Sequence, residues 1–126
     1  MNTCRPKVPL PDRGLMHSAE AERLGVLFKC ISQPTRLRLL HAMIRCDALS
    51  VGDLASEIGM TVQAVSNQLQ RLTEAGVVGC KREGVQAFYR VIDPCVPVLI
   101  ERGWCHIEEY PALGARDTAA STRASA

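Results

Sequence analysis

The chain has 126 residues, of which 47% are hydrophobic, and a formal net charge of +2. This length is enough for one domain with a single core, and no unbroken apolar run reaches the roughly 18 residues of a membrane span. The start of the chain is basic and proline-rich without the apolar stretch of a secretory signal, so we expect a cytosolic protein. The small net charge does not indicate a partner, and charge has to be interpreted locally.

Six cysteines are many for a chain of this size. In a reducing cytosol we do not expect structural disulfides, which leaves metal ligation, redox sensing or packing as small apolar side chains. None of the six forms a C-x-x-C pair, which argues against a zinc ribbon.

Residues 1–17 and 111–126 are expected to be flexible tails, because the first stretch is proline-rich and the second is small, polar and aperiodic. The folded domain is therefore expected over residues 18–110. It begins with a predicted helix over residues 18–31, with Ser18 as a plausible N-cap. Its apolar residues recur at helical spacing; they are Leu24, Leu27, Phe28 and Ile31.

A second helix is predicted over residues 35–45, after Pro34 has ended the first. Helical spacing places three apolar residues inward, namely Leu37, Leu40 and Ile44. The same spacing turns Arg36 and Arg38 outward.

Two further helices follow in close succession. Ser50 and Asp53 form the S-x-x-D pattern of a capping box at the start of a helix over residues 51–58, which Gly59 ends. Thr61 caps the next helix, over residues 62–75, before Gly76. Its predicted core residues are Val62, Val65, Leu69 and Leu72. The joint of three residues is too short for antiparallel packing and predicts a helix-turn-helix, with an ordinary helical hairpin as the alternative.

Two β-prone runs, residues 77–82 and 85–91, flank Glu83 and Gly84 and predict a hairpin. A basic hairpin directly after a recognition helix is a wing, with Lys81 and Arg82 expected at its tip. Asp93 and Pro94 then begin a last helix that runs to about Tyr110. The predicted fold is mainly α with a small β-hairpin, a winged helix-turn-helix.

In a helix-turn-helix the exposed face of the second helix enters the major groove. Here that face is polar and suited to base edges and phosphates; it carries Thr61, Gln63, Ser66, Asn67, Gln68 and Arg71. The wing adds Lys81, Arg82 and Gln86 for backbone contacts. A merely solvated face would normally show Glu–Lys pairs, and none occurs here. One such unit contacts little DNA, so we expect a homodimer on an inverted repeat, formed through the first and last helices.

Three segments resemble the ArsR/SmtB family of repressors. Residues 32–40 resemble its "DPTRLRIL" segment, residues 64–72 its "AVSxHLxxL" recognition helix, and residues 75–89 its "AGLVxxRREGxxxYY" wing. The resemblance covers about residues 20 to 110. It implies a homodimeric repressor that leaves an inverted-repeat operator when an inducer binds, most often a metal or metalloid ion.

The sequence departs from one pattern of the family. Members with a metal site on the first helix of the helix-turn-helix carry "ELCVCDL", whereas this chain has Ser50 and Gly52 at the cysteine positions. That site is absent, and any sensing has to occur elsewhere.

The last helix resembles a second family pattern, D-x-H-x10-H-x-x-[EH], with Asp93, Cys95, His106 and Glu109 at its positions. Residues 95 and 106 share a helix face but lie roughly 16 Å apart along the axis, too far for one ion. Antiparallel pairing of two last helices would bring Cys95 of one subunit to His106 and Glu109 of the other. This predicts a site that exists only in the dimer.

Two further cysteines favour soft-metal chemistry at this site. Cys105 is next to His106, and Cys30 replaces the alanine usual in the family's "FKALADPTR". Soft thiolates favour Hg(II), Cd(II), Pb(II), As(III) or Cu(I). We therefore expect a site of Cys95 and Cys105 completed by Cys30 or His106, with Hg(II) as the first candidate inducer and As(III) or Cd(II)/Pb(II) next.

The plainer interpretations of these residues stay open. Cys30 can be a core residue, Cys80 a packed residue of the first wing strand, and Cys46 a loop residue. Cys4 lies in the predicted tail, from which it can still donate a ligand. His17 and His41 have no neighbouring ligand pattern.

Three rival functions remain at this point. A thiol-based redox or persulfide switch would keep the fold and change the signal. A cysteine-nucleophile enzyme is disfavoured, because the side chains of Cys105 and His106 diverge by about 100° on a helix and no oxyanion loop is recognisable. An interaction module without DNA binding is disfavoured by the polar recognition face and the basic wing.

Overall fold

The computed structural model describes residues 4–110. It divides into two compact units, Met1–Val96 and Pro97–Ala126, which are described separately below. The first unit contains a short 3₁₀ helix η1 (Leu10–Asp12), four α-helices and the strands. The α-helices are α1 (Ser18–Ile31), α2 (Pro34–Cys46), α3 (Val51–Ile58) and α4 (Val62–Glu74). The last helix, α5 (Cys95–Glu109), begins in the first unit and continues into the second.

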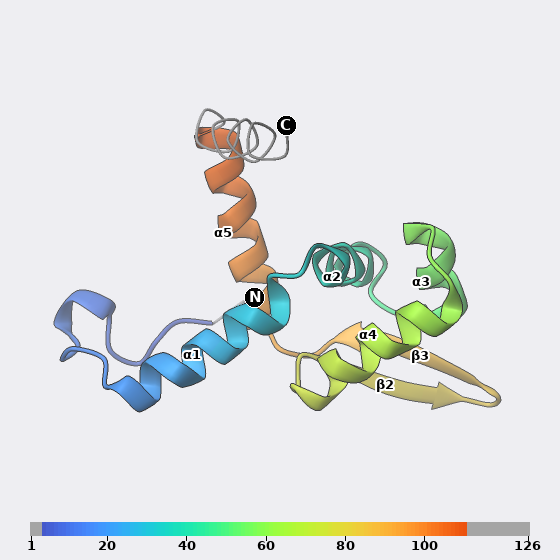
Figure 1. Ribbon diagram of the computed structural model, residues 1–126, viewed down its shortest axis with the longest axis horizontal. Helices are drawn as coiled ribbons and strands as arrows, with labels where there is room; N and C mark the ends of the chain where they lie inside the picture. The colour runs from blue at the N-terminus through green and yellow to red at the C-terminus, as the bar shows by residue number, and fades with distance from the viewer. Residues whose placement is uncertain (1–3, 111–126) are drawn as a thin grey trace, which may run out of the picture. The chain divides into compact units, whose positions relative to one another are not determined.

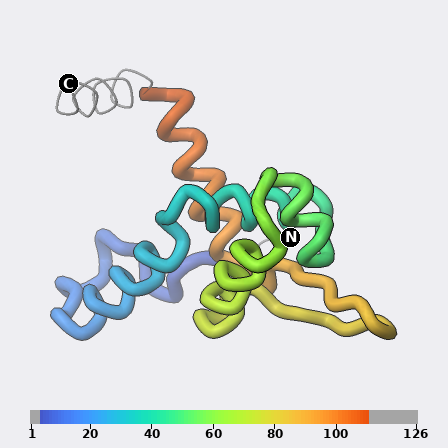
Figure 2. The backbone as a smooth tube through the Cα atoms, turned by 45° about the vertical axis from the view of Figure 1, so that its right-hand side comes forward, coloured from blue at the N-terminus to red at the C-terminus, as the bar shows by residue number. Residues whose placement is uncertain are grey.

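The sheet has one strand more than the sequence predicted. It comprises β1 (Leu49–Ser50), β2 (Val78–Glu83) and β3 (Gln86–Val91), in the order β1-β3-β2, with both pairs antiparallel. The base of the hairpin of β2 and β3 lies beside α4, and its tip projects past the helices (Figures 1 and 2). Leu49 pairs with Tyr89, so the residues before α3 join the base of the wing to the helix-turn-helix. Two residues are too short a strand for a sequence pattern to reveal.

The predicted bounds of α3 and the predicted start of α4 are confirmed, and α4 ends at Glu74, one residue before the predicted end. Ser50 Oγ accepts a hydrogen bond from Asp53 N at 3.1 Å, and Asp53 Oδ2 accepts from Ser50 N at 3.4 Å. Gly59 ends α3 with φ of 70°, in the left-handed region that only glycine adopts at little cost. Thr61 Oγ1 then caps α4 by accepting from Ala64 N at 3.2 Å. These local bonds set the short turn between the two helices.

The core of the first unit lies between α2, α3, α4 and the base of the sheet. Its fully buried side chains come from each of these elements and from the start of α5; they are Leu39, Leu40, Met43, Leu54, Val65, Leu69, Leu72, Val77, Val78 and Val96. Among the described residues no charged or polar residue is buried in this core. The buried start of α5 places Cys95 directly beside the core.

Three details of the predicted helices were wrong. His17, not Ser18, is the N-cap of α1. In α2 the apolar stripe is rotated, because Leu39 and Met43 are buried whereas Ile44 is 39% exposed. In α4, Val62 is 51% exposed, since the first turn of the helix projects beyond the core. None of the described helices is long and apolar enough to span a membrane.

Candidate DNA interface and thiol sites

The exposed side of α4 has the features of a recognition surface. Val65, Leu69 and Leu72 hold the opposite side of the helix in the core. Gln63, Asn67 and Arg71 are exposed, and Ser66 is half-buried at the edge of the same surface. Thr61 serves mainly as the N-cap of the helix. The helix is therefore anchored by its apolar residues and presents polar ones to solvent.

Two amides on this surface are held together. Gln63 Nε2 donates to Asn67 Oδ1 at 3.2 Å, one helical turn apart. Asparagine and glutamine amides can each pair in bidentate fashion with adenine in the major groove. The bond keeps both side chains aligned along the face that would meet base edges.

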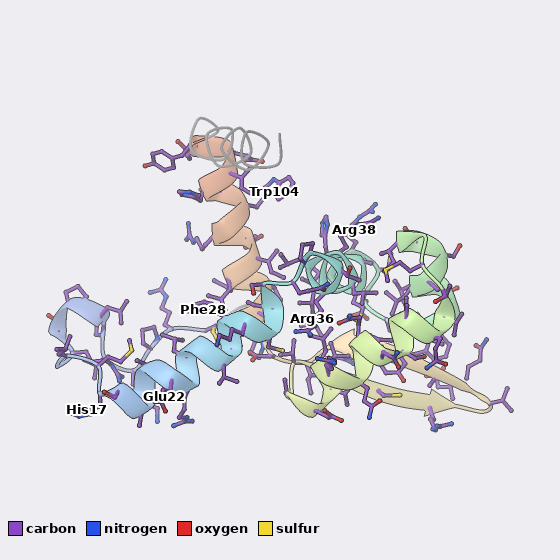
Figure 3. The ribbon with its side chains drawn as sticks, in the orientation of Figure 1. His17, Glu22, Phe28, Arg36, Arg38 and Trp104 are labelled. Atoms are coloured by element: carbon purple, nitrogen blue, oxygen red, sulfur yellow. A yellow bond between two sulfur atoms is a disulfide. The ribbon has the colours of Figure 1, made fainter. Side chains whose placement is uncertain are left out.

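Gln68 lies differently from the other predicted DNA contacts. It is half-buried, and its Oε1 accepts from Nε of Arg36 at 2.8 Å. Arg36 also donates from Nη1 to the carbonyl of Cys30 at 2.9 Å, so one guanidinium joins the end of α1 to α4 (Figure 3). The prediction that Arg36 points outward was wrong, because these two acceptors draw it inward. Nothing in the spacing of the sequence pointed to this bond across 32 residues.

The wing carries the predicted basic residues, but its tip lies further along the chain. Lys81 pairs with Phe88 and Arg82 with Ala87 inside the hairpin, while the turn is at Gly84 and Val85. Lys81 Nζ lies 3.9 Å from Glu83 Oε1, with both side chains largely exposed. Such a surface pair contributes little to stability, which leaves the lysine available for a phosphate. Gln86 is exposed at the end of the hairpin, opposite Glu83.

Cys80 lies in the first wing strand, as predicted, and is directly across from Tyr89 of β3 in the hairpin of β2 and β3. Burial raises the pKa of the Tyr89 phenol above its usual value of 10.0, and the neighbouring Cys80 raises it further by a smaller amount. Cys80 itself is exposed and free.

Cys95 is joined to Cys4 by a disulfide, with the two Cα atoms 5.4 Å apart and a sequence separation of 91. The prediction that no disulfide would form was therefore wrong for this pair. Asp93 Oδ1 accepts from Cys95 N at 2.9 Å, so the predicted Asp93 cap is present, but α5 begins at Cys95 and not at the predicted Pro94. The next residue, Val96, is fully buried. Cys95 is thus fixed to the core on one side and bonded to the N-terminal segment on the other.

The remaining cysteines and predicted ligands are found on α1, on α2 and in the second unit. Cys30 is half-buried in the last turn of α1, and Cys46 is exposed at the end of α2 rather than in a loop. In the second unit Cys105, His106 and Glu109 are exposed on α5, and the His106 ring lies 5.2 Å from that of Tyr110. Over residues 4–110 the chain brings no three cysteine, histidine or acidic side chains together as a metal site.

A compact helix-turn-helix, a polar recognition surface and a basic hairpin define a winged-helix DNA-binding protein. Comparison with known proteins supports this class: the family model "Helix-turn-helix domain" matches residues 31–79. The regulator NmtR of Mycobacterium tuberculosis is 34% identical over 90% of this chain and 88% of its own length. The cadmium resistance regulatory protein CadC of Listeria innocua is 33% identical over 68% of this chain and 71% of its own.

A solved structure is more similar still. The antimony-specific transcriptional repressor AntR superimposes with a TM-score of 0.75 and is 50% identical, covering 86% of this chain and 98% of its own. The chain belongs to the ArsR/SmtB family of winged-helix transcriptional repressors. It is a transcriptional regulator and not an enzyme.

Proposed function

We propose that this protein is a homodimeric repressor that binds an inverted-repeat operator and is released when a thiophilic ion binds its cysteines. The observation that carries the proposal is the position of Cys95, a cysteine at the start of α5 directly beside the buried Val96, whose thiol is set free when its bond to Cys4 is reduced. A ligand held by this thiol acts on the core that supports the recognition helix. The expected cytosolic location supplies the reduced thiols that ligation needs.

The surface of the outer helices supports a dimer. Val26 and Phe28 of α1 are 68% and 46% exposed, and Trp104 and Ile107 of α5 are 60% and 57% exposed. Exposed large apolar side chains, present here on each of the two helices, are typical of protein–protein interfaces. A second copy of the chain is the occupant that the family resemblance implies.

DNA recognition in this proposal divides between the two exposed elements. Gln63, Asn67 and Arg71 of α4 contact base edges and adjacent phosphates, with Thr61 and Ser66 at the margin of the surface. Lys81, Arg82 and Gln86 contact the DNA backbone from the wing. Gln68 accepts a hydrogen bond from Arg36 and so helps to position α4 rather than contacting DNA itself.

The proposed inducer site is built from Cys95 and Cys105, completed by Cys30 or His106, with Asp93 and Glu109 as neighbouring carboxylates. Sequence patterns alone favoured Hg(II), followed by As(III) and Cd(II)/Pb(II). The 50% identity with an antimony-specific repressor now adds Sb(III) and moves the trivalent metalloids to the front. Arsenic and antimony in this oxidation state share a strong preference for thiolates over oxygen ligands.

A path for the signal follows from the bonds of Arg36. This side chain connects the carbonyl of Cys30, a proposed ligand, to Gln68 of the recognition helix. A ligand that displaces the end of α1 would therefore shift α4 relative to the DNA. Typical coupling energies of about 1–3 kcal/mol correspond to 5- to 150-fold in operator affinity.

The disulfide favours a second candidate function, a thiol redox switch. Oxidation of Cys4 and Cys95 would then be the signal, with no ion required. The two candidates differ in their response to a reductant and to a chelator.

The experiment is fluorescence anisotropy of the reduced, metal-free protein on DNA from upstream of its own gene. It is titrated with Sb(III), As(III), Hg(II), Cd(II), Pb(II) and Zn(II) under reductant. Release by one soft ion, lost in Cys95→Ser and retained in Cys46→Ser, supports the metalloregulator. Release by an oxidant that persists in the presence of a chelator, with no response to any ion, supports the redox switch.

A further inference from the structure

The N-terminal segment reaches the start of α5 through a cysteine. Residues 5–13 are all exposed and η1 buries no residue, yet Cys4 is bonded to Cys95. Cys4 is the first described residue, and Cys95 is the first residue of α5, so the bond joins two segments separated by 91 positions in the sequence. A segment without buried side chains thus delivers a thiol to a position beside the core.

Cys95 is the fixed member of the pair. Its backbone N–H is bonded to Asp93 Oδ1 at 2.9 Å, and the following Val96 is fully buried. The Cys4 side of the pair lies on the exposed segment. When the bond is reduced, the fixed thiol therefore faces a second thiol that remains tethered nearby by the folded chain.

We propose that reduced Cys4 and Cys95 of the same chain form a dithiol site that chelates trivalent arsenic or antimony. This inference rests on the proposed function and assigns Cys4 a role in it. It also differs from the ligand set above, because both sulfur atoms come from one chain and no partner subunit is needed. The chelate would tie the N-terminal segment to the start of α5, as the disulfide does.

The ligation step involves no change of oxidation state. With an organoarsenic(III) oxide, each thiol loses its proton to the oxide oxygen, two As–S bonds form, the As=O bond is lost and one water leaves. A second thiol held close by the chain makes this bidentate product far more resistant to competing monothiols than a single As–S bond, because its effective concentration is about millimolar or higher. Oxidation to the disulfide consumes both thiols, so the oxidised pair cannot bind the metalloid.

The remaining cysteines supply matched controls. Cys46 and Cys80 are both exposed and free, and each lies on a different element from the pair. Replacing either one removes a reactive thiol without touching Cys4 or Cys95. A variant with only Cys4 and Cys95, in which Cys30, Cys46, Cys80 and Cys105 are serine, isolates the proposed site.

The test uses phenylarsine oxide, which is retained firmly only by two neighbouring thiols. The full-length reduced protein is incubated with one equivalent and then with excess monothiol, and intact mass is measured. We expect one phenylarsenic group per chain, with loss of two thiol hydrogens, in the wild type, Cys46→Ser, Cys80→Ser and the two-cysteine variant. In a Cys105→Ser background, which removes the inter-subunit pair proposed above, the adduct should persist while Cys4 and Cys95 are present and should be lost when either is changed to serine. Oxidation with diamide should also remove the adduct, and a dithiol reductant should restore it.

Circular dichroism of each variant separates loss of the site from loss of the fold. An adduct that survives in the folded Cys4→Ser/Cys105→Ser variant overturns the inference, and so does its absence from the two-cysteine variant. Operator release measured in parallel distinguishes the two proposals. Release of wild type and Cys4→Ser at the same Sb(III) concentration leaves the proposed function standing and removes Cys4 from it. A Cys4-dependent adduct without any operator release supports the dithiol site and contradicts the proposed function.

Discussion

The helix-turn-helix and the outer helices of this protein use apolar residues in opposite ways. Helix α4 buries Val65, Leu69 and Leu72 almost completely, whereas α1, of nearly the same length, buries only Ile31. Both helices show apolar residues at helical spacing. The spacing therefore predicts a helix with an apolar face but does not reveal whether that face packs within the chain or against another molecule.

The largest effect is expected in the helix-turn-helix. Leu69→Ala removes a side chain that is 1% exposed and should lower the free energy of unfolding by about 2–5 kcal/mol, because a cavity remains in the core. Urea unfolding at a fixed protein concentration measures it. The control is Leu24→Ala in α1, 39% exposed, which should cost much less in the monomer. Equal losses in the monomer would contradict the contrast drawn between the two helices.

The outer helices should respond in assembly rather than in folding. Phe28→Ala is expected to weaken dimerisation by about 2 kcal/mol or more if this exposed aromatic side chain lies at the centre of an interface. Sedimentation equilibrium over a range of concentrations gives the dissociation constant. Val85→Ala is the matched control, since this apolar residue is 98% exposed at the wing turn. An unchanged dissociation constant in Phe28→Ala would exclude this face of α1 from the interface.

The two regions are joined by Arg36, and breaking that connection should weaken the coupling between them. Arg36→Gln removes the charged donor of the hydrogen bonds to Cys30 O and Gln68 Oε1. Each lost hydrogen bond should lower the free energy of unfolding by about 1.5–3 kcal/mol. We expect the ratio of operator affinities without and with inducer to fall toward one. Arg38→Gln is the control. Among the hydrogen bonds of the described residues, the Arg38 side chain donates only to the carbonyl of Ile58 in α3, at 3.2 Å, and so does not connect α1 to α4. A ratio that stays at the wild-type value in Arg36→Gln shows that the signal takes another route.

The smallest effects separate α4 from the wing. Asn67→Ala should cost about 1–3 kcal/mol on the operator and little on unrelated DNA, because a base contact carries sequence information. Lys81→Ala should weaken binding to both DNAs equally and reduce the slope of log affinity against log salt by about one. Anisotropy titrations on both DNAs at several salt concentrations measure these effects. A loss of specificity in Lys81→Ala and none in Asn67→Ala would reverse the proposed roles.

The sequence by itself determined the features that depend on neighbouring residues. Residue type and spacing predicted the capping box of Ser50 and Asp53 and the Thr61 cap, which are hydrogen bonds between residues three apart. They also predicted that Gly59 ends α3, where the backbone is left-handed. The hairpin of the wing and the Asp93 cap of α5 follow the same rule. These local signals were enough to predict the winged helix-turn-helix and the polar, exposed face of α4 that is proposed to contact DNA.

The tertiary structure decided what depends on residues far apart in the chain. The disulfide spans 91 residues, the bond of Arg36 to Gln68 spans 32, and the pairing of Leu49 with Tyr89 joins a strand of two residues to the wing. The rotation of the apolar stripe in α2 belongs here too, because helical spacing allows Ile44 or Met43 to face inward and only the neighbouring elements select Met43. Such contacts form when distant elements meet, and no pattern of adjacent residues encodes which of six cysteines will lie side by side.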